Sequence, residues 1–221
     1  LLERFHLDPD KIKVVYLGLD RTFWKAATRP EQNSVLTHFK LPSQFLLFVG
    51  ALERRKNLIT LLKAFKTVRR RHNKLHLVLA GRKGEDTKNI LRTIQELKID
   101  RCVKLTGYCS EQELRSLYSA AALFVFPSFH EGFGLPMVEA MACSVPVTAS
   151  RTSAISEIGQ KAVDYFDPGN PEDMARSILT VLEDTTLRKS LISRGKKRSA
   201  EFSWRTTAEQ TLNFYQKVME Q

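Results

Sequence analysis

Two glutamates lie on either side of a predicted helix start, in the stretch S-F-H-E-G-F-G-L-P-M-V-E-A-M-A-C. Glu131 precedes Gly132 and Gly134, which give the backbone freedom to turn, and Pro136 suits the first turn of a helix. Glu139 falls inside that helix, where its neighbours are almost all apolar. Because an ionised carboxylate in apolar surroundings needs a partner, Glu139 is a candidate binding residue.

Two further features of the sequence could hold an anion. The free N–H groups at the helix start, near Gly134 and Leu135, can bind an anion or sugar hydroxyl oxygens. The segment G-A-L-E-R-R-K-N places Gly50 at a strand end and Arg55 and Lys56 just before a helix. A diphosphate needs this combination of close backbone approach and cationic side chains. The alternative is an exposed basic helix start, which the unfavourable placement of cations at a helix N-terminus weakens.

The elements that must position these residues alternate between short β-rich runs and helical stretches, which indicates βαβ units and a parallel sheet. Strands are predicted at 45–49, 75–80, 103–106, 123–126, 145–148 and 163–166. Helices are predicted at 57–72, 87–98, 110–121, 172–183, 187–201 and 204–220, besides those that begin near Pro136 and at Thr152 and Ser153. The predicted fold is α/β: a doubly wound, parallel, six-stranded Rossmann-like sheet with terminal helices. In such a sheet ligands bind outside the carboxyl ends of the strands.

Glutamate, seven residues and glutamate, enclosing G-F-G-L-P, resemble the signature of the retaining GT-B glycosyltransferases of family 4, also called glycosyl transferases group 1. The resemblance is to the C-terminal, donor-binding domain of that family. It implies that Glu131 faces the donor sugar as a catalytic residue and that Glu139 holds the ribose hydroxyls of a nucleotide sugar. It also implies that a short backbone segment lies against sugar and diphosphate. That segment consists of Gly132, Phe133, Gly134 and Leu135.

The resemblance extends to the other loops of the expected site. It implies that Lys56 and Arg55 act on the phosphates of the donor, with Gly50 beside them, and that Tyr108 lies near the nucleobase. Many members carry arginine directly after the glycine, where this chain has Ala51. The family chemistry implies no cofactor and no metal. The donor is expected to be a UDP-, GDP- or ADP-sugar.

The resemblance also divides the chain. Residues 1–40 are expected to be a remnant of an N-terminal domain with its linker, including a short β-rich run and a turn at 11–20. Residues 41–200 form the nucleotide-sugar-binding domain, and 201–221 a helix that would pack back on the N-terminal domain. The acceptor, a sugar or lipid-linked glycan as in polysaccharide biosynthesis, would bind through that other domain. The chain alone is therefore expected to bind donor but to transfer sugar slowly or not at all.

Composition bounds the partners. The net charge of +11 makes anionic ligands, lipids and nucleic acid candidate partners. No nucleic-acid motif and no interleaved aromatic residues accompany the basic runs, which argues against nucleic acid. Solvated helix faces are the first interpretation of those runs, and peripheral contact with the inner face of the membrane is the second. The longest apolar runs are far shorter than the roughly 20 residues of a membrane span. Three cysteines without metal-ligand spacing favour reduced thiols and a cytoplasmic location.

Two other functions remain open at this stage. A glycoside hydrolase would use Glu131 and Glu139 as its acid and its nucleophile or base, but the basic loops expected to face them suit a phosphate better. A non-catalytic basic module for lipid or nucleic acid would bind in a steeply salt-dependent way, independently of Glu139.

Overall fold

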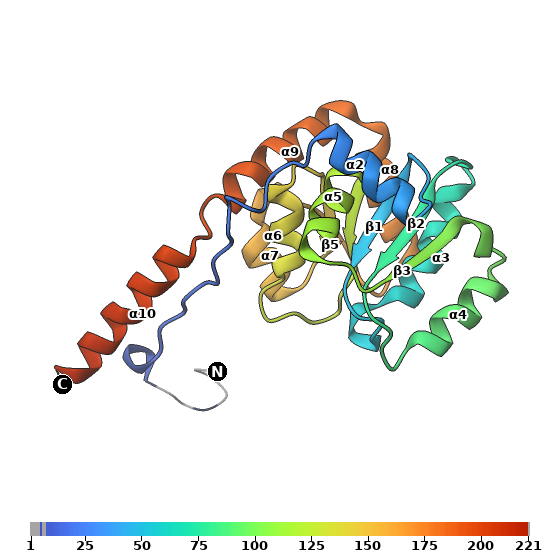
Figure 1. Ribbon diagram of the computed structural model, residues 1–221. Helices are drawn as coiled ribbons and strands as arrows, with labels where there is room; N and C mark the ends of the chain where they lie inside the picture. Colours follow the sequence, from blue (N-terminus) through green and yellow to red (C-terminus); the bar gives the residue numbers. More distant parts are fainter. Residues whose placement is uncertain (1–4, 6–7, 221) are drawn as a thin grey trace.

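The computed structural model describes residue 5 and residues 8–220 and contains one six-stranded parallel sheet (Figure 1). The strand order is β3-β2-β1-β4-β5-β6, which reverses direction between β1 and β4. Such a reversal is the switch point at which doubly wound folds bind ligands. The strands are β1 (Phe45–Val49), β2 (His76–Ala80), β3 (Val103–Gly107), β4 (Leu123–Phe126), β5 (Val147–Ser150) and β6 (Asp164–Phe166). The predicted fold class is confirmed.

The fifth strand begins two residues later than predicted, because the preceding residues complete the end of a helix. Ser144 adopts a left-handed conformation with φ 67°, and the N–H of Val145 donates to the carbonyl of Ala140 at 3.2 Å. Pro146 has no N–H to give to a ladder, although its carbonyl accepts from Phe124. Regular pairing of β5 with β4 therefore starts at Val147.

Helices cover both faces of the sheet and enclose two buried clusters. One cluster joins the sheet to α3, α4 and α8, and the other joins it to α2, α5, α6 and α7. The alternation of side chains along each strand accounts for this division, since Leu46 and Phe48 enter the first cluster while Phe45 and Leu47 enter the second. The helices are α2 (Arg29–His38), α3 (Leu58–Arg69), α4 (Thr87–Glu96), α5 (Glu111–Ala120), α6 (Leu135–Ala142), α7 (Ser153–Gly159), α8 (Pro171–Glu183), α9 (Thr185–Ser199) and α10 (Trp204–Met219).

The sequence interpretation of the first forty residues was wrong in two places. It missed α2, which begins with a capping box between Thr28 and Glu31 and packs against α5, where Arg115 forms an ion pair with Glu31. It also expected a β-rich run at 11–20, but residues 12–20 contain no strand, since no sheet edge lies beside them. β-branched residues favour a strand only where a neighbouring strand accepts them.

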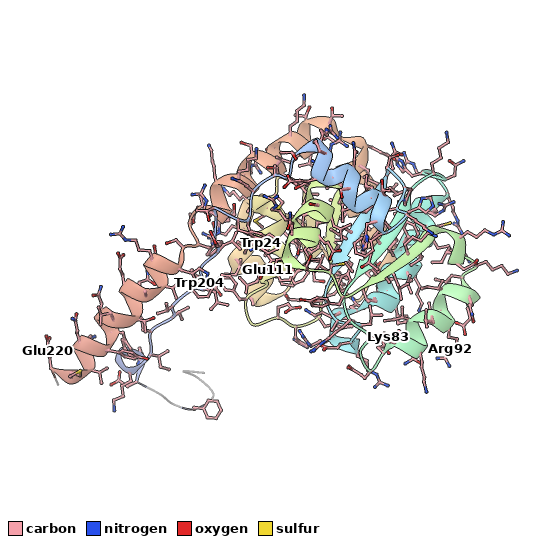
Figure 2. The ribbon with its side chains drawn as sticks, viewed as in Figure 1. Trp24, Lys83, Arg92, Glu111, Trp204 and Glu220 are labelled. Carbon is pink, nitrogen blue, oxygen red and sulfur yellow. The ribbon has the colours of Figure 1, made fainter. Side chains whose placement is uncertain are left out.

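The last helix stands apart from the sheet (Figure 1). Within the described chain α10 has no buried residue, and Trp204 at its start is 53% exposed (Figure 2). Residues 12–20 run beside it: Thr207 Oγ1 donates to the carbonyl of Tyr16 at 2.7 Å. Leu212 and Tyr215 of this helix are likewise exposed. The division into 1–40, 41–200 and 201–221 stays a prediction, and its residues 1–4, 6–7 and 221 lie outside the described part.

The first interpretation of the charge placed the basic runs on solvated helix faces, but some basic side chains contact other parts of the fold. Arg198 is buried: its Nε donates to the carbonyl of Ile158 at 2.8 Å and its guanidinium lies 4.7 Å from the Phe202 ring centroid. Arg69 donates to the carbonyl of Leu75, and Arg71 pairs with Glu183 at 2.8 Å. These arginines join elements of the fold, and the remaining cations carry the open positive charge.

Candidate functional site

The loop after β1 buries a lysine beside the sheet. A single 3-10 turn, Arg54–Lys56, follows the strand, and Asn57 then takes a left-handed conformation before α3 begins. Lys56 is only 5% exposed, and its Nζ lies 2.5 Å from Glu131 Oε1 and 5.6 Å from the Phe126 ring centroid. A buried ammonium needs such partners.

Glycine is required where this loop leaves the strand. Gly50 has φ 152°, and a Cβ there would lie 3.0 Å from the Phe48 ring and 3.4 Å from Lys56 Cε. A larger residue would therefore displace the lysine. This places the predicted Gly50 directly beside the predicted Lys56.

The loop after β4 brings the first glutamate to these cations. Arg55 Nη1 lies 3.4 Å from Glu131 Oε2, while Arg55 Nε donates to Glu53 at 2.9 Å. The N–H of Phe129 donates to the carbonyl of Arg55 at 2.8 Å, which ties the two loops together through their backbones. The structure thus joins Arg55, Lys56 and Glu131 into one charged cluster, although Glu131 follows the two cations by 76 and 75 positions in the sequence.

The start of α6 has the open geometry that the sequence predicted. Gly134 is the N-cap with φ 97° and no side-chain cap, and Leu135 is the first helical residue. A Cβ on the exposed Gly132 would meet nothing within 4 Å. Phe133 packs its ring on Tyr16 and Phe202, at 6.0 and 5.3 Å between centroids, which anchors the loop. Uncapped N–H groups therefore border an open space.

Glu139 lies within α6 in a very different setting from Glu131. Burial raises the pKa of this carboxyl from 4.5 to about 7, although a hydrogen bond from Tyr118 acts in the opposite direction. Tyr118 Oη donates to Glu139 Oε2 at 2.9 Å. The carboxyl is held at one oxygen and changes its ionisation near neutral pH.

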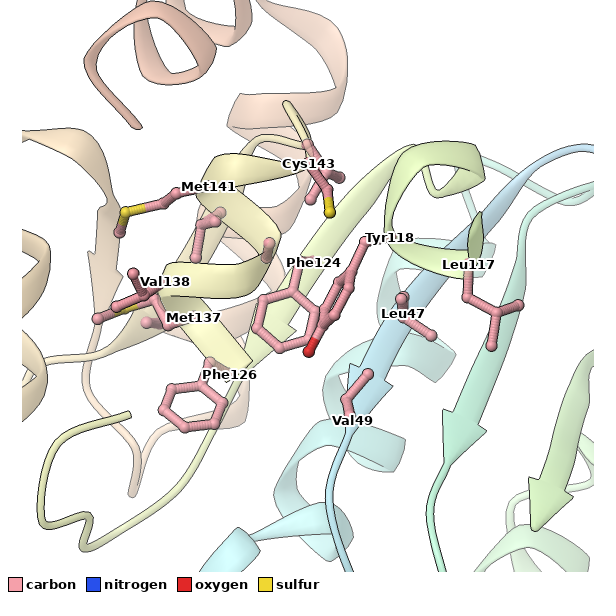
Figure 3. Packing of buried hydrophobic residues seen from close by; sticks show 14 of the residues in the cluster. Leu47, Val49, Leu117, Tyr118, Phe124, Phe126, Met137, Val138, Met141 and Cys143 are labelled. Atoms are coloured by element: carbon pink, nitrogen blue, oxygen red, sulfur yellow. The ribbon is translucent and has the colours of Figure 1, made fainter. Parts of the chain in front are cut away.

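Tyr118 was missed by the sequence interpretation. It is fully buried on α5, where its ring lies beside Phe124 (Figure 3), at 5.3 Å between centroids. The ring of Trp24 lies 6.0 Å away on the same measure. Burial, first of all, raises its pKa well above 10. A signal existed: Leu114, Leu117 and Tyr118 share the apolar face of the helix, where a hydroxyl needs a partner just as Glu139 does.

Other predicted residues are not drawn into the cluster. Tyr108 follows β3 and is 81% exposed; within the described chain it makes no hydrogen bond or ring contact. His130 is exposed beside Glu131. Thr152 is the N-cap of α7, and its buried Oγ1 has no hydrogen-bond partner in the described residues.

Residue 5 and residues 8–220 contain no group of three or more His, Cys, Asp or Glu side chains that could hold a metal ion. In the same residues no helix is long and apolar enough to cross a bilayer. All three cysteines are free, and burial raises the pKa of the Cys143 thiol to about 12.

The model of the family described as glycosyl transferases group 1 matches residues 32–198, a range that contains the whole sheet and every residue of the charged cluster. This chain belongs to that family. As a group 1 glycosyltransferase chain, it is 33% identical over 183 residues to the O-antigen chain mannosyltransferase B of Escherichia coli, a match that covers 82% of this chain and 48% of that protein. The chain spans about half the length of that relative.

Solved structures agree on the fold. Sucrose-phosphate synthase of Thermosynechococcus elongatus superposes with a TM-score of 0.81 at 25% identity, covering 94% of this chain and 53% of that one. Alr3699/HepE of Anabaena, in complex with UDP and glucose, gives a TM-score of 0.83 at 22% identity, covering 92% of this chain and 56% of that one. The group 1 chain thus has the fold of GT-B glycosyltransferases, as the sequence resemblance implied.

Proposed function

We propose that this chain is the donor-binding half of a retaining glycosyltransferase that takes a sugar from a nucleoside diphosphate sugar. The observation that carries the proposal is the buried ion pair of Lys56 and Glu131 beside the uncapped start of α6. The Phe126 ring links the two, since Lys56 Nζ lies 5.6 Å from its centroid and a Cβ on Gly134 would lie 3.3 Å from its edge. An ammonium, a guanidinium and free N–H groups together suit a diphosphate. Family membership and the UDP complex of Alr3699/HepE support the same ligand class.

In this proposal Lys56 and Arg55 stabilise the charge that develops on the departing diphosphate. An ammonium has three N–H donors, and Glu131 accepts one, which leaves two for phosphate oxygens. The N–H groups at Gly134 and Leu135 add the helix dipole. Because these groups are already fixed before the donor arrives, little reorganisation accompanies charge development.

The two carboxyl groups take different parts. Glu131, on the loop, faces the sugar and holds the cations in place. Glu139 accepts the ribose hydroxyls through the oxygen that Tyr118 does not occupy. Tyr108 is free to stack on the base, since nothing in the described residues holds its ring.

The acceptor belongs to the rest of the protein in this proposal. The name of the Escherichia coli relative supports a glycan acceptor, a sugar or a lipid-linked chain, as in polysaccharide biosynthesis. Such a chain would be bound across the donor site by a second domain, and no metal or cofactor is expected in the transfer. By itself this chain would bind nucleotide and transfer sugar slowly.

Calorimetric titration with UDP, GDP and ADP tests the donor site. One nucleotide is expected to bind saturably, and binding should be weakened by about 100-fold in Lys56→Ala and less strongly in Glu139→Gln. Lys63→Ala, which removes an exposed cation on the outer side of α3, is the matched control and should bind normally. Equal affinity in the wild-type chain and both site variants would contradict the proposal, and it would favour the basic-module alternative if binding were steeply salt-dependent.

A cytoplasmic chain with peripheral membrane contact is the corresponding proposal for location. Exposed Arg194, Lys196 and Lys197 on α9 supply a positive face, and in the described part of the chain none of them pairs with a carboxylate. Arg194 donates to the carbonyl of Lys161. Each such cation adds about 1 kcal/mol near an anionic surface. Co-sedimentation with phosphatidylglycerol vesicles should fall when all three become alanine, and unchanged sedimentation would contradict it.

A further inference from the structure

A hollow of about 600 Å³ lies beside the two loops that carry the charged cluster. It lies between the start of α3 and the first turns of α4, and its rim includes Arg54 and Phe129. These two residues adjoin the loops of the donor site, since Arg54 precedes Arg55 and Phe129 donates its N–H to the Arg55 carbonyl. The lining residues are Arg54, Asn57, Ile59, Thr60, Asp86, Asn89, Arg92, Thr93 and Phe129.

The inner wall of the hollow is polar and preorganised. Asn89 Nδ2 donates to Asp86 Oδ1 at 2.8 Å, and Arg92 Nη2 donates to Asn89 Oδ1 at 3.2 Å. Asp86 is 5% exposed, and its second carboxylate oxygen has no hydrogen bond within residue 5 and residues 8–220. This arrangement presents an acceptor, an amide and a guanidinium along the first two turns of α4.

The rim of the hollow adds an aromatic ring to these polar groups. Phe129 is 37% exposed although its backbone is fixed by the bond to Arg55. Opposite lie Ile59 and Thr60 of the first turn of α3, both half-buried. An aromatic face beside a row of donors and acceptors matches a sugar ring, whose C–H face is apolar and whose edge carries hydroxyl groups.

The charge of the hollow distinguishes this ligand from an anion. Arg92 pairs with Glu96 at 3.7 Å, and Glu85 accepts the backbone N–H of Arg54 at 3.2 Å, which brings a further carboxylate to the Arg54 backbone. Asp86 adds a third carboxylate within the hollow itself. A phosphate would have to approach Asp86, whereas neutral hydroxyl groups can donate to it.

We propose that this hollow binds a neutral oligosaccharide, with Asp86, Asn89 and Arg92 on its hydroxyl groups and Phe129 against a ring face. Its lining contains none of the charged cluster Arg55, Lys56 and Glu131, so the site is distinct from that of the donor nucleotide. That the bound saccharide is the glycan being extended rests on the proposed function. Binding of the saccharide itself does not depend on it.

Amide chemical-shift mapping on the chain with α-linked mannotetraose and with maltotetraose tests the site. At least one of them should shift the amides of Thr60 and Asn89. Phe129→Ala should weaken binding about tenfold and Phe129→Tyr should retain it, whereas Asn89→Ala should weaken it about fivefold. Tyr215→Ala removes a more exposed ring on α10 and should change nothing.

Titration with UDP, GDP and ADP on the same samples separates this inference from the proposed function, because Asn89→Ala should leave nucleotide affinity unchanged. The inference would be overturned if neither tetrasaccharide shifted the amides at the hollow at about 10 mM, which is roughly the weakest useful affinity. Equal loss of binding in Tyr215→Ala would overturn it too. Pyrophosphate shifting the same amides more strongly would show an anion site instead.

Discussion

Glu131 and Glu139 are the same residue type, eight positions apart, in two opposite environments. Glu131 lies on a loop with the Lys56 ammonium at 2.5 Å and the Arg55 guanidinium at 3.4 Å. Glu139 lies in a helix among apolar side chains, with a single phenol as its partner, and burial raises its pKa to about 7. The spacing is local in sequence, but the partners come from different elements.

The difference shows how one short motif produces two kinds of carboxyl group. The first is paired with two cations, whereas desolvation disfavours the charged form of the second. The first is suited to hold positive charge against a diphosphate. The second can exchange a proton when hydroxyl groups approach it.

Removing the cation beside Glu131 should have the largest effect. In Lys56→Ala the loss of a charge-assisted bond should weaken nucleotide diphosphate binding by about 100-fold, equivalent to about 3 kcal/mol. The buried Glu131 would also lose its closest partner, which should lower the free energy of unfolding by a few kcal/mol, roughly as for other broken buried pairs. Calorimetry and urea unfolding measure the two effects.

Glu131→Gln in the Lys56→Ala background sharpens that result. It removes the unpaired carboxylate and should recover much of the lost free energy of unfolding, without recovering nucleotide affinity. Recovery of both quantities would mean that Lys56 acts only by pairing with Glu131 and not on the ligand.

Acid pH should weaken nucleotide binding through Glu139. Its pKa is raised to about 7, so the carboxyl is increasingly protonated below that value and loses its ability to accept two ribose hydroxyls. Affinity should therefore fall by up to about tenfold per pH unit below the pKa. In Glu139→Gln the pH dependence between 6 and 8 should disappear. A profile that keeps its slope in this variant would assign the titration to another group.

The same shift has the opposite sign for the stability of the folded chain. The folded state keeps a proton on Glu139 up to about pH 7, whereas the unfolded state releases it near 4.5. The folded state therefore binds more protons in that window, and the free energy of unfolding should decrease as pH rises through it. Denaturant unfolding of wild type and Glu139→Gln at pH 5 and 8 measures this, and the variant should show the shallower decrease.

Tyr118→Phe should have the smallest effect. It removes the hydrogen bond that lowers the pKa of Glu139, so the midpoint of the binding–pH profile should move to higher pH. Affinity at pH 8 should fall only a few-fold, since one hydrogen bond contributes about 1 kcal/mol. An unmoved midpoint would show that the phenol packs beside Glu139 without tuning it.

Periodicity and turn residues were sufficient to predict the sheet, because its six strands are short β-rich runs that alternate with helical stretches. The same approach failed for α2, whose ten residues contain a single buried side chain, Val35, and so show little apolar periodicity. Thr28, Pro30 and Glu31 nevertheless form an N-cap signal that predicts the start of this helix and does not depend on burial.

The candidate site was predictable where a loop follows a strand and not where partners cross between helices. Gly50, Arg55 and Lys56 were found because a loop after a parallel strand must lie at the edge where ligands bind. The bond from Tyr118 to Glu139 joins α5 to α6 across 21 positions and depends on how those helices pack. The ring of Phe133 likewise meets Tyr16 and Phe202, which sequence spacing cannot bring together.

The two tryptophans of the chain differ strongly in solvent exposure, and their fluorescence can therefore be told apart. Trp24 is 8% exposed and lies against Tyr118, whereas Trp204 is 53% exposed at the start of α10. An aqueous quencher such as acrylamide would extinguish mainly the emission of Trp204. The fluorescence that survives then reports from the ring that supports Tyr118, one hydrogen bond away from Glu139.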